Sequence, residues 1–235
     1  MLKALIRRLL AYHPDPRTAA VRERLAPMRR AERPYVPDYE GDLIFRLVAD
    51  GATRECLEVG FGTGSTAAYM LAGIAAGGGG SVTSIDFSAA NFNHLGKALI
   101  AGDKRHTLLE ENSNRALPRL FAENRTFDFI YVDGWKTFDH LAMEAYFLAR
   151  MLRTGGVILF DDAYMPSVGR VISLLKKFYG FEEIGYAANG QGFRLRLWLA
   201  IVFRTQRRPY RALKKRHDLA DLPVENDWNF DAPLR

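Results

Sequence analysis

Short apolar runs alternate with amphipathic stretches through most of the chain. Runs rich in β-branched residues predict buried strands, and longer stretches with apolar residues every three or four positions predict helices. Such alternation is typical of a parallel sheet with helices on both faces. The predicted strands are residues 55–59, 81–86, 105–109, 127–132, 156–160, 181–187 and 193–203. The predicted helices between them are residues 64–75, 89–101, 114–122, 137–152 and 167–179.

The last two predicted strands differ from the first five, because no helical stretch separates them. Asn189 and Gly190 lie between them and are typical of a tight β-hairpin turn. We therefore expect five parallel strands followed by an antiparallel hairpin. The predicted fold class is α/β, with a Rossmann-like doubly wound sheet that is mostly parallel and has an antiparallel last strand.

Prolines interrupt the first 50 residues, which read as separate helices. The predicted helices are residues 2–12, 16–29 and 38–49. A helical segment ahead of an α/β core is a candidate lid over a substrate site. We therefore divide the chain into a helical extension over residues 1–50, an α/β domain over 51–203 and a basic tail over 204–235.

Composition is that of an ordinary globular protein. The 235 residues are 48% hydrophobic and 26% charged, enough to bury a sizeable core. The single cysteine, Cys56, excludes a disulfide within one chain and fits a reducing compartment. No stretch approaches the length of a membrane span, and charges interrupt the apolar residues at the N-terminus. We expect a cytoplasmic protein.

The net charge of +6 is concentrated near the ends of the chain. Arginines are frequent in residues 1–33 and again in residues 204–216. Basic runs can bind nucleic acid or an anionic membrane, but no nucleic-acid motif accompanies them here. A solvated tail or an oligomer arm is the favoured interpretation. Residues 1–10 form an amphipathic pattern suited to packing on this domain or on a second copy, so a homodimer is compatible with the sequence.

Three alternating glycines follow the first predicted strand. Gly60, Gly62 and Gly64 come directly after an apolar strand and before a helix that starts near Ser65. Glycine permits positive φ angles and lets a ligand lie on the backbone, where the next helix points its N–H groups. Glu58 precedes the glycines and would meet a ligand's ammonium group at the strand tip. The alternative is a glycine-rich turn that binds nothing.

This loop resembles the first motif of the class I S-adenosylmethionine-dependent methyltransferases, in which that acid serves the methionine end of the cofactor. A dinucleotide site would have the different spacing G-x-G-x-x-G. Asp86 ends the second predicted strand, where an acid can accept both ribose hydroxyls, and Phe87 could flank the adenine ring. Asn112 and Ser113 lie where the family keeps polar contacts to adenine. For Asp86, Asn112 and Ser113 the alternative is helix capping.

Acids also end the fourth and fifth predicted strands. Asp133 follows one, and Asp161 and Asp162 follow the other. Neighbouring parallel strands bring their carboxyl ends to one edge of the sheet, where three carboxylates repel one another unless a cation joins them. Oxygen ligands select a hard ion such as Mg²⁺. The alternative is a helix cap at Asp133 and a solvated turn at the other two.

The run Asp133-x-Trp135-Lys136 together with these acids resembles the metal-dependent O-methyltransferases of the catechol type, and the pair Asp161-Asp162 is more similar to the macrolide sugar O-methyltransferases. The resemblance covers roughly residues 50–200. It implies transfer of a methyl group from S-adenosylmethionine to a hydroxyl of a small molecule, either a phenol or catechol or a sugar. Asp133 would then serve the cofactor, the metal and catalysis, and Lys136 would be the general base, with His140 as the competing base.

Other functions stay open at this point. A methyltransferase that needs no metal would keep the glycine loop and lose the aspartate site. A nucleic-acid methyltransferase would use the basic ends, but no Asn-Pro-Pro-Tyr or Pro-Cys type motif follows the fourth predicted strand. A non-catalytic binding protein of the same fold would not need to keep the glycines and all of the acids.

Overall fold

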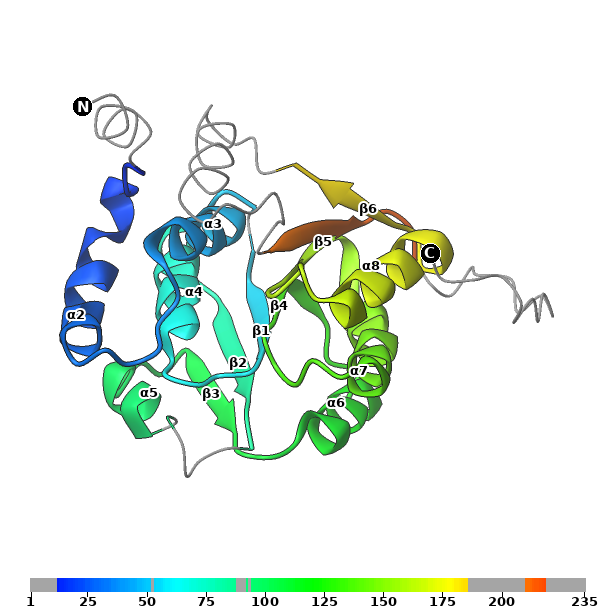
Figure 1. Cartoon of the computed structure of the whole chain (residues 1–235), viewed down its shortest axis with the longest axis horizontal. Coiled ribbons are helices and arrows are strands. Elements are labelled where there is room, and N and C mark those ends of the chain that lie inside the picture. Colours follow the sequence, from blue (N-terminus) through cyan, green and yellow to red (C-terminus); the bar gives the residue numbers. More distant parts are fainter. Residues whose placement is uncertain (1–11, 52, 88–91, 93, 186–209, 219–235) are drawn as a thin grey trace.

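The computed structural model describes residues 12–51, 53–87, 92, 94–185 and 210–218, which form a seven-stranded sheet between two layers of helices (Figure 1). The strand order is β3-β2-β1-β4-β5-β7-β6. The first five strands in the chain run parallel, and β7 runs antiparallel to both of its neighbours. The strands are β1 (Glu55–Val59), β2 (Ser81–Ile85), β3 (His106–Leu109), β4 (Phe127–Val132), β5 (Leu152–Phe160), β6 (Phe181–Ile184) and β7 (Arg211–Lys215). The predicted fold class is confirmed.

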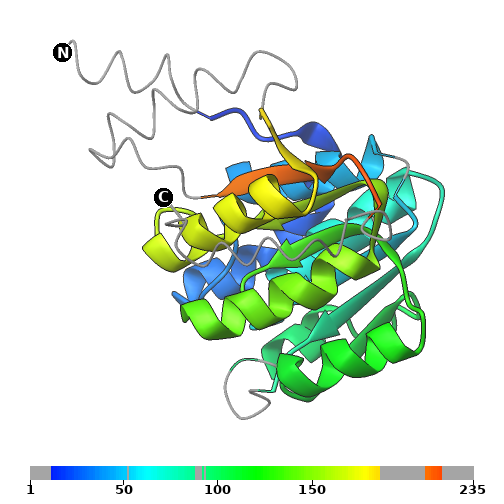
Figure 2. The same ribbon diagram turned by 90° about the vertical axis from the view of Figure 1, so that its right-hand side faces the viewer.

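Helices cover both faces of the sheet. On one face α6, α7 and α8 lie side by side (Figure 2), and α2, α3, α4 and α5 belong to the other side (Figure 1). The bounds are η1 (Pro16–Thr18), α2 (Ala19–Arg30), α3 (Asp38–Ala49), α4 (Ser65–Ala76), α5 (His94–Leu99), α6 (Ser113–Ala122), α7 (Phe138–Met151) and α8 (Pro166–Phe178). Within the described residues, no helix has the length and apolar character needed to cross a membrane.

The sheet separates two buried apolar clusters, one under each helical layer. Leu57 and Ile130 point into the cluster under α6, α7 and α8, whereas Cys56 and Phe129 point into the cluster under α3 and α4. Successive residues of a strand face opposite sides, so a strand covered on both faces needs apolar residues at every position. This explains the continuous apolar runs in the sequence. Burial raises the pKa of the Cys56 thiol, which is consistent with an inert packing role.

The seventh strand corrects the expected C-terminal tail. Residues 211–215 were assigned to a basic tail that begins at residue 204, but they form β7 between β5 and β6. Ala212 and Leu213 are buried, and the ammonium group of the buried Lys215 donates to the carbonyl oxygen of Leu152 at 2.8 Å. The tail was predicted from its positive charge alone. Long basic side chains can nevertheless belong to a strand, because they can bury their aliphatic parts and pair their charged ends.

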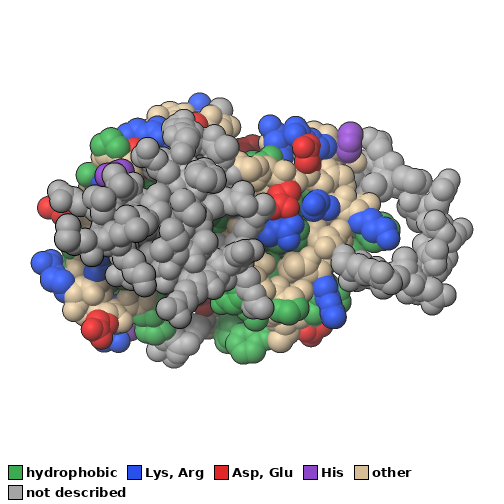
Figure 3. All heavy atoms as spheres, turned by 45° about the horizontal axis from the view of Figure 1, so that its top comes forward, with side chains coloured by type: hydrophobic (Ala, Val, Ile, Leu, Met, Phe, Trp, Pro, Cys, Tyr) green, Lys and Arg blue, Asp and Glu red, His purple; other side chains and the backbone are tan. Residues whose placement is uncertain are grey.

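The two arginines of this region are paired with acids. Arg211 forms a two-pronged ion pair with Glu183 of β6, and Arg216 donates to Glu182 at 2.7 Å. Figure 3 shows one face of the molecule, on which separate Lys and Arg side chains lie with acids beside several of them. These two arginines therefore offer little free charge to a polyanion.

Several sequence predictions lie outside the described residues. They are the helix over residues 2–11, the start of the helix over 89–101, the strand over 193–203 with its Asn189-Gly190 turn, and residues 219–235. Elsewhere the agreement is close: the predicted strands 55–59 and 127–132 and the predicted helix 38–49 have the observed bounds. Strand β5 starts four residues before the predicted 156, because the chain turns directly from α7 into the sheet at Leu152.

A buried carboxylate fixes the N-terminal segment on the core. Asp42 of α3 is fully buried and accepts hydrogen bonds from the Tyr12 hydroxyl at 2.5 Å, the Asp15 amide at 2.6 Å and the Thr18 hydroxyl at 2.5 Å. The guanidinium group of Arg22 lies 3.5 Å from the same carboxylate. Each of these contacts spans 20 or more residues, so a single side chain holds this segment, η1 and α2 against α3.

Asp42→Ala should destabilise the fold strongly. It would leave three donors and one guanidinium group without their buried acceptor, a loss of about 3 kcal/mol or more in the free energy of unfolding. Urea unfolding followed by circular dichroism measures this. Asp50→Ala is the matched control, because Asp50 ends the same helix and its ion pair with Arg17 is exposed, so its loss should cost at most about 1 kcal/mol. Equal effects of the two substitutions would contradict the assignment.

Candidate active site

The carboxyl ends of four strands meet at one edge of the sheet. Hydrogen bonds continue past the strand ends: the Gly60 amide donates to the carbonyl oxygen of Ile85 at 2.9 Å, and the Asp133 amide donates to that of Val59 at 2.8 Å. The Asp161 amide in turn donates to the carbonyl oxygen of Val132 at 3.1 Å. The expected convergence of the strand tips is therefore confirmed, and it is held by backbone bonds.

The three glycines of the loop all have positive φ, but only two of them pack against protein. A Cβ on Gly60, at φ +96°, would lie 2.4 Å from the carbonyl oxygen of Asp133, and one on Gly64, at φ +71°, would lie 2.8 Å from the Cα of Gly96. A Cβ on Gly62, at φ +48°, would have no neighbour within 4 Å. The loop is therefore tight at both ends and open in the middle, where a ligand can approach the backbone.

Two side chains hold the loop and the helix that follows it. Asp86 accepts a hydrogen bond from the Gly62 amide at 2.8 Å, which brings the tip of β2 against the loop. Ser65, the first residue of α4, accepts one from the Val36 amide at 3.0 Å. The second contact joins the segment ahead of α3 to the start of α4. The predicted cofactor residues Asp86 and Ser65 thus both border the glycine loop, and their cofactor contacts stay predictions.

Glu58 is buried in β1, two residues before the first glycine of the loop. Its side chain is fully buried and accepts a 2.5 Å hydrogen bond from the Ser84 hydroxyl, which also contacts the ring of His106 at 2.9 Å. Burial raises its pKa well above the usual range of a glutamate. Its side chain points to the same face of the sheet as that of Cys56, under α4, and its predicted contact with the ammonium group of a ligand stays a prediction. Its second oxygen has no partner among the described residues.

Two adjoining hollows border the glycine loop. The first, here called the loop pocket, has a volume of about 260 Å³ and is lined by Gly62, Ser65 and the segment ahead of α3, together with Asp86, Asp133 and Asp161. The second, here called the ring pocket, has a volume of about 460 Å³ and is lined by Asp86, Phe87, Asn112, Ser113, Trp135 and His140. Asp86 and Asp133 belong to both, so one elongated ligand could extend from one hollow into the other.

The predicted adenine residues all line the ring pocket, although two of them have other partners. Phe87 is 62% exposed, which leaves its ring open to a flat ligand. The Asn112 side chain caps α6 by accepting from the Asn114 amide at 3.1 Å, as the capping alternative expected. Ser113 donates to Glu144 at 2.7 Å and contacts His140 at 2.8 Å. Contacts of these residues with adenine stay predictions.

The three aspartates at the strand tips form one cluster. One carboxylate oxygen from each of Asp133, Asp161 and Asp162 lies within 4.8 Å of the others. Burial and the nearby Asp133 raise the pKa of Asp161 to about 7. Asp162 has a φ of +50°, an uncommon conformation for a residue with a side chain and one often found at functional sites. The three residues meet as the sequence predicted, and an all-oxygen set of this kind fits a hard divalent cation.

Lys136 and His140 belong to different parts of the site. The Lys136 ammonium group lies 2.9 Å from Asp133 and 3.9 Å from Asp162, and its side chain is only 12% exposed. His140 instead contacts Ser113 and lies 3.1 Å from Glu144, at the wall of the ring pocket. Of these two candidate bases, Lys136 contacts the aspartate cluster and His140 does not.

Sequence reasoning missed Glu40. This residue of α3 is 4% exposed, lines the loop pocket and accepts a hydrogen bond from the Tyr131 hydroxyl at 2.9 Å. Burial first, and then the nearby Asp161, raise its pKa well above the usual range. The available signal in the sequence was weak, because Glu40 lies in the first turn of α3, where acids are common for reasons of helix stability alone.

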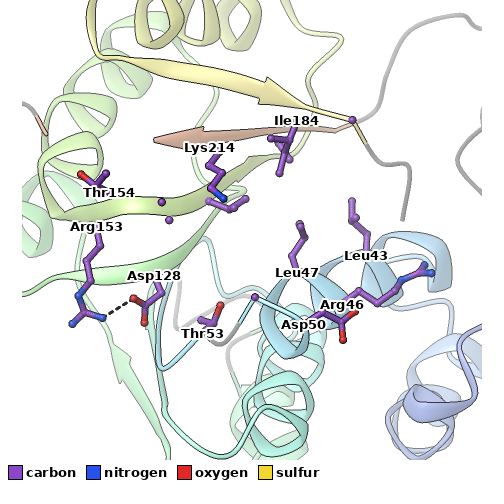
Figure 4. Close-up of a pocket in the computed structure, with 16 residues that line it drawn as sticks. Leu43, Arg46, Leu47, Asp50, Thr53, Asp128, Arg153, Thr154, Ile184 and Lys214 are labelled. Carbon is purple, nitrogen blue, oxygen red and sulfur yellow. Dashed lines mark hydrogen bonds and ion pairs between the residues drawn. The ribbon is translucent and has the colours of Figure 1, made fainter. Parts of the chain in front are cut away.

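A hollow larger than either of these two lies elsewhere. It has a volume of about 500 Å³, and Figure 4 shows it between α3 and the strands β5 and β7, with Lys214, Leu47 and the Arg153–Asp128 ion pair in its wall. It contains none of the glycine-loop or strand-tip residues described above. Volume alone therefore does not mark the site.

Substitutions at two of the loop glycines should separate folding from binding. Gly60→Ala forces a Cβ into the backbone of Asp133 and should lower the free energy of unfolding by about 3 kcal/mol. Gly62→Ala should cost only about 1 kcal/mol, from its positive φ, but place a methyl group where the ligand lies. Thermal unfolding and titration with S-adenosylmethionine measure the two effects. A Gly62→Ala protein that binds the cofactor normally would contradict this geometry.

The stability of the metal-free protein should depend on Asp161 in a defined direction. Its raised pKa means that the folded state keeps a proton between about pH 4 and pH 7 that the unfolded chain releases, so this contribution to stability falls as the pH rises through that window. In Asp161→Asn, the free energy of unfolding should fall less steeply as the pH rises. Urea unfolding at a series of pH values measures this. Asp139→Asn, at an exposed site whose pKa is lowered, is the control. An unchanged profile for Asp161→Asn would refute the prediction.

Known structures share this fold over nearly the whole chain. Cofactor-bound Rv0187 from MTB is 17% identical, covers 92% of this chain and 97% of its own, and superposes with a TM-score of 0.64. An O-methyltransferase from Bacillus cereus, solved with SAH, is 16% identical over 91% of this chain and 97% of its own, with a TM-score of 0.56. The O-methyltransferase TomG from Streptomyces achromogenes, solved with SAM, is 14% identical over 92% and 96%, with a TM-score of 0.56.

A comparison with protein-family models matches the part of the chain that contains the glycine loop and the aspartate cluster. Residues 57–163, from β1 through the aspartate cluster, match the family model described as a methyltransferase domain. No match is found among curated proteins. The matched segment contains the glycine loop, Asp86 and the three clustered aspartates. Residues 57–163 thus match a methyltransferase domain, and the fold is that of structures solved with a cofactor, with SAH or with SAM.

Proposed function

We propose that this protein is an S-adenosylmethionine-dependent enzyme, a divalent-metal-assisted O-methyltransferase that acts on a hydroxyl group of a small molecule. The observation that carries the proposal is the aspartate cluster beside the loop pocket, with its three carboxylate oxygens within 4.8 Å of one another. Structures with the same fold include O-methyltransferases from Bacillus cereus and Streptomyces achromogenes. Each neighbour is too distant to transfer its substrate, so the acceptor class rests on the site itself.

The two adjoining pockets suit the two ends of S-adenosylmethionine. The ring pocket offers the exposed ring of Phe87 for adenine, and Asp86, which belongs to both pockets, is placed for the ribose. The loop pocket offers Gly62, which has open space above it, and the start of α4 for the methionine end. Free N–H groups at a helix start favour a carboxylate. The reactive methyl group would then lie beside the aspartate cluster.

The aspartates fit Mg²⁺ or a similar hard ion. Asp133, Asp161 and Asp162 supply only oxygen ligands, and their mutual repulsion is relieved by a divalent cation. When bound, such an ion lowers the pKa of a coordinated acceptor hydroxyl. The task of the protein is then to hold the acceptor oxygen in line with the methyl group, so that an oxygen–carbon bond forms as the carbon–sulfur bond breaks.

Lys136 is the best placed proton acceptor. Its side-chain nitrogen lies 2.9 Å from Asp133 and 3.9 Å from Asp162. A hydroxyl group bound at the cluster would therefore be close enough to transfer its proton to Lys136. At present its ammonium group balances the two carboxylates. With a divalent cation held by the aspartates, the ammonium group would no longer be needed for that balance and could lose a proton to solvent, and the neutral amine could then accept the proton of the acceptor hydroxyl. His140 is engaged with Ser113 and Glu144 in the ring pocket and is the weaker candidate.

Exposed aromatic rings near the cluster favour a flat acceptor. Trp135 is 63% exposed and Tyr164 is 48% exposed, and each is within three residues of an aspartate of the cluster. Such rings bind phenols and catechols by stacking and can also bind the apolar face of a sugar. The nucleic-acid alternative loses some support, because Arg211 of β7 is paired with Glu183 and Lys215 is buried.

Lys136→Ala should reduce turnover by a factor of about 10² to 10⁴, because a positioned general base contributes about that much. Methyl transfer to a panel of catechols, phenols and sugars measures turnover, and titration with S-adenosylmethionine checks that cofactor affinity is retained. Lys104→Ala removes an exposed lysine far from the cluster and is the control for net charge. Near-normal turnover of Lys136→Ala would assign the proton to another group.

Metal dependence has a separate test. After treatment with a chelator, the wild-type protein should bind S-adenosylmethionine but transfer methyl groups poorly, and Mg²⁺ should restore transfer. Asp162→Asn should shift this restoration to higher Mg²⁺ concentration, because it removes one charged ligand. Full activity in chelator would leave a methyltransferase that needs no metal, with the rest of the site unchanged.

A further inference from the structure

The loop pocket has an unusual charge balance. Four carboxylates belong to its wall, from Glu40, Asp86, Asp133 and Asp161, and no lysine, arginine or histidine is among the described residues that line it. Carboxylates gathered in a hollow of about 260 Å³ repel one another and favour a positively charged occupant. The pocket itself therefore points to a cation.

Three of the four carboxylates already have a role or a partner. Asp86 accepts from the Gly62 amide at 2.8 Å, and Asp133 pairs with Lys136 at 2.9 Å. Asp161 belongs to the aspartate cluster. Glu40 is different, because it comes from the helix α3 rather than from a strand tip and lies outside the cluster that would hold a metal. Its described hydrogen-bond donor is the neutral hydroxyl of Tyr131.

Glu40 is also firmly positioned. Tyr131 is fully buried in the sheet and holds Glu40 from below at 2.9 Å. Helix α3 is packed closely on α4, where a Cβ on Gly41, the next residue, would lie 2.3 Å from the ring of Tyr69. The segment just ahead of α3 is bonded to Ser65 at the start of α4. A carboxyl group held in this way has a fixed place in the pocket, and a cationic ligand beside it favours its charged form.

We propose that Glu40 recognises the positive sulfonium group of S-adenosylmethionine, so that the site distinguishes the cofactor from its product S-adenosylhomocysteine. This inference rests on the proposed cofactor site. The two molecules share adenosine, ammonium and carboxylate groups and differ in the methyl group and in the charge on sulfur. A fixed carboxylate near the sulfur therefore favours only the charged molecule. Transfer of the methyl group removes that charge, and with it the interaction, so Glu40 also assists release of the product.

Glu40→Gln tests the proposal, because glutamine has nearly the same shape and keeps an oxygen for the Tyr131 hydroxyl. Calorimetric titrations of the full chain are made in chelator, so that metal binding plays no part. The dissociation constant for S-adenosylmethionine should rise about tenfold, equivalent to ~1.4 kcal/mol. The dissociation constant for S-adenosylhomocysteine should change less than twofold. An analogue with a protonated amine in place of the sulfonium should behave like S-adenosylmethionine.

Glu123→Gln is the matched control, since it removes the same charge from an exposed position at the end of α6 and should leave both constants unchanged. If Glu40→Gln weakens both ligands equally, Glu40 contacts a shared group and the proposal is wrong. If it weakens neither, Glu40 has only a structural role and the proposal is equally wrong. Wild-type protein that binds neither ligand would instead refute the proposed cofactor site, which separates that failure from a failure at Glu40.

Discussion

The backbone ladder across β2, β1, β4 and β5 is the constraint on which the site depends. Its last hydrogen bonds lie beyond the strand ends, at Gly60, Asp133 and Asp161, and so fix the peptide planes from which the functional side chains start. The glycine at position 60 is part of the same constraint, because a side chain there would collide with the backbone of Asp133. A parallel sheet thus supplies a rigid edge, and the functional side chains belong to the residues that directly follow the carboxyl ends of its strands.

Electrostatic imbalance is the second feature that unites the site. The sheet edge gathers the carboxylates of Asp86, Asp133, Asp161 and Asp162, and helix α3 adds Glu40 from the opposite side. Lys136 compensates only part of this charge. Such an arrangement is costly for a protein unless cations bind there. A cationic cofactor and a divalent metal ion would both relieve the repulsion, and the proposed function accounts in this way for the many acids at this edge of a chain that is basic overall.

Much of this could be predicted because it is local. The strand and helix pattern follows from periodicity, and the glycine loop and the acids Asp133 and Asp161 follow from residue types at strand ends. The parts that could not be predicted depend on tertiary contacts. Glu40 belongs to the site only because α3 packs on α4 and faces Tyr131, which is 91 residues away. Likewise β7 was not predicted, because its basic residues resemble an exposed tail, whereas Arg211 pairs with Glu183 of β6 and Lys215 is buried. The full burial of Glu58 also depends on the tertiary packing around β1.

The most direct test of this account is a crystal structure of the protein with S-adenosylhomocysteine and Mn²⁺, with the metal located by its anomalous signal. The account predicts adenine beside Phe87, ribose at Asp86 and the sulfur atom between the glycine loop and Glu40. It also predicts one metal peak among Asp133, Asp161 and Asp162. A ligand bound elsewhere, for example in the hollow at Lys214, or a metal peak away from the three aspartates, would contradict it.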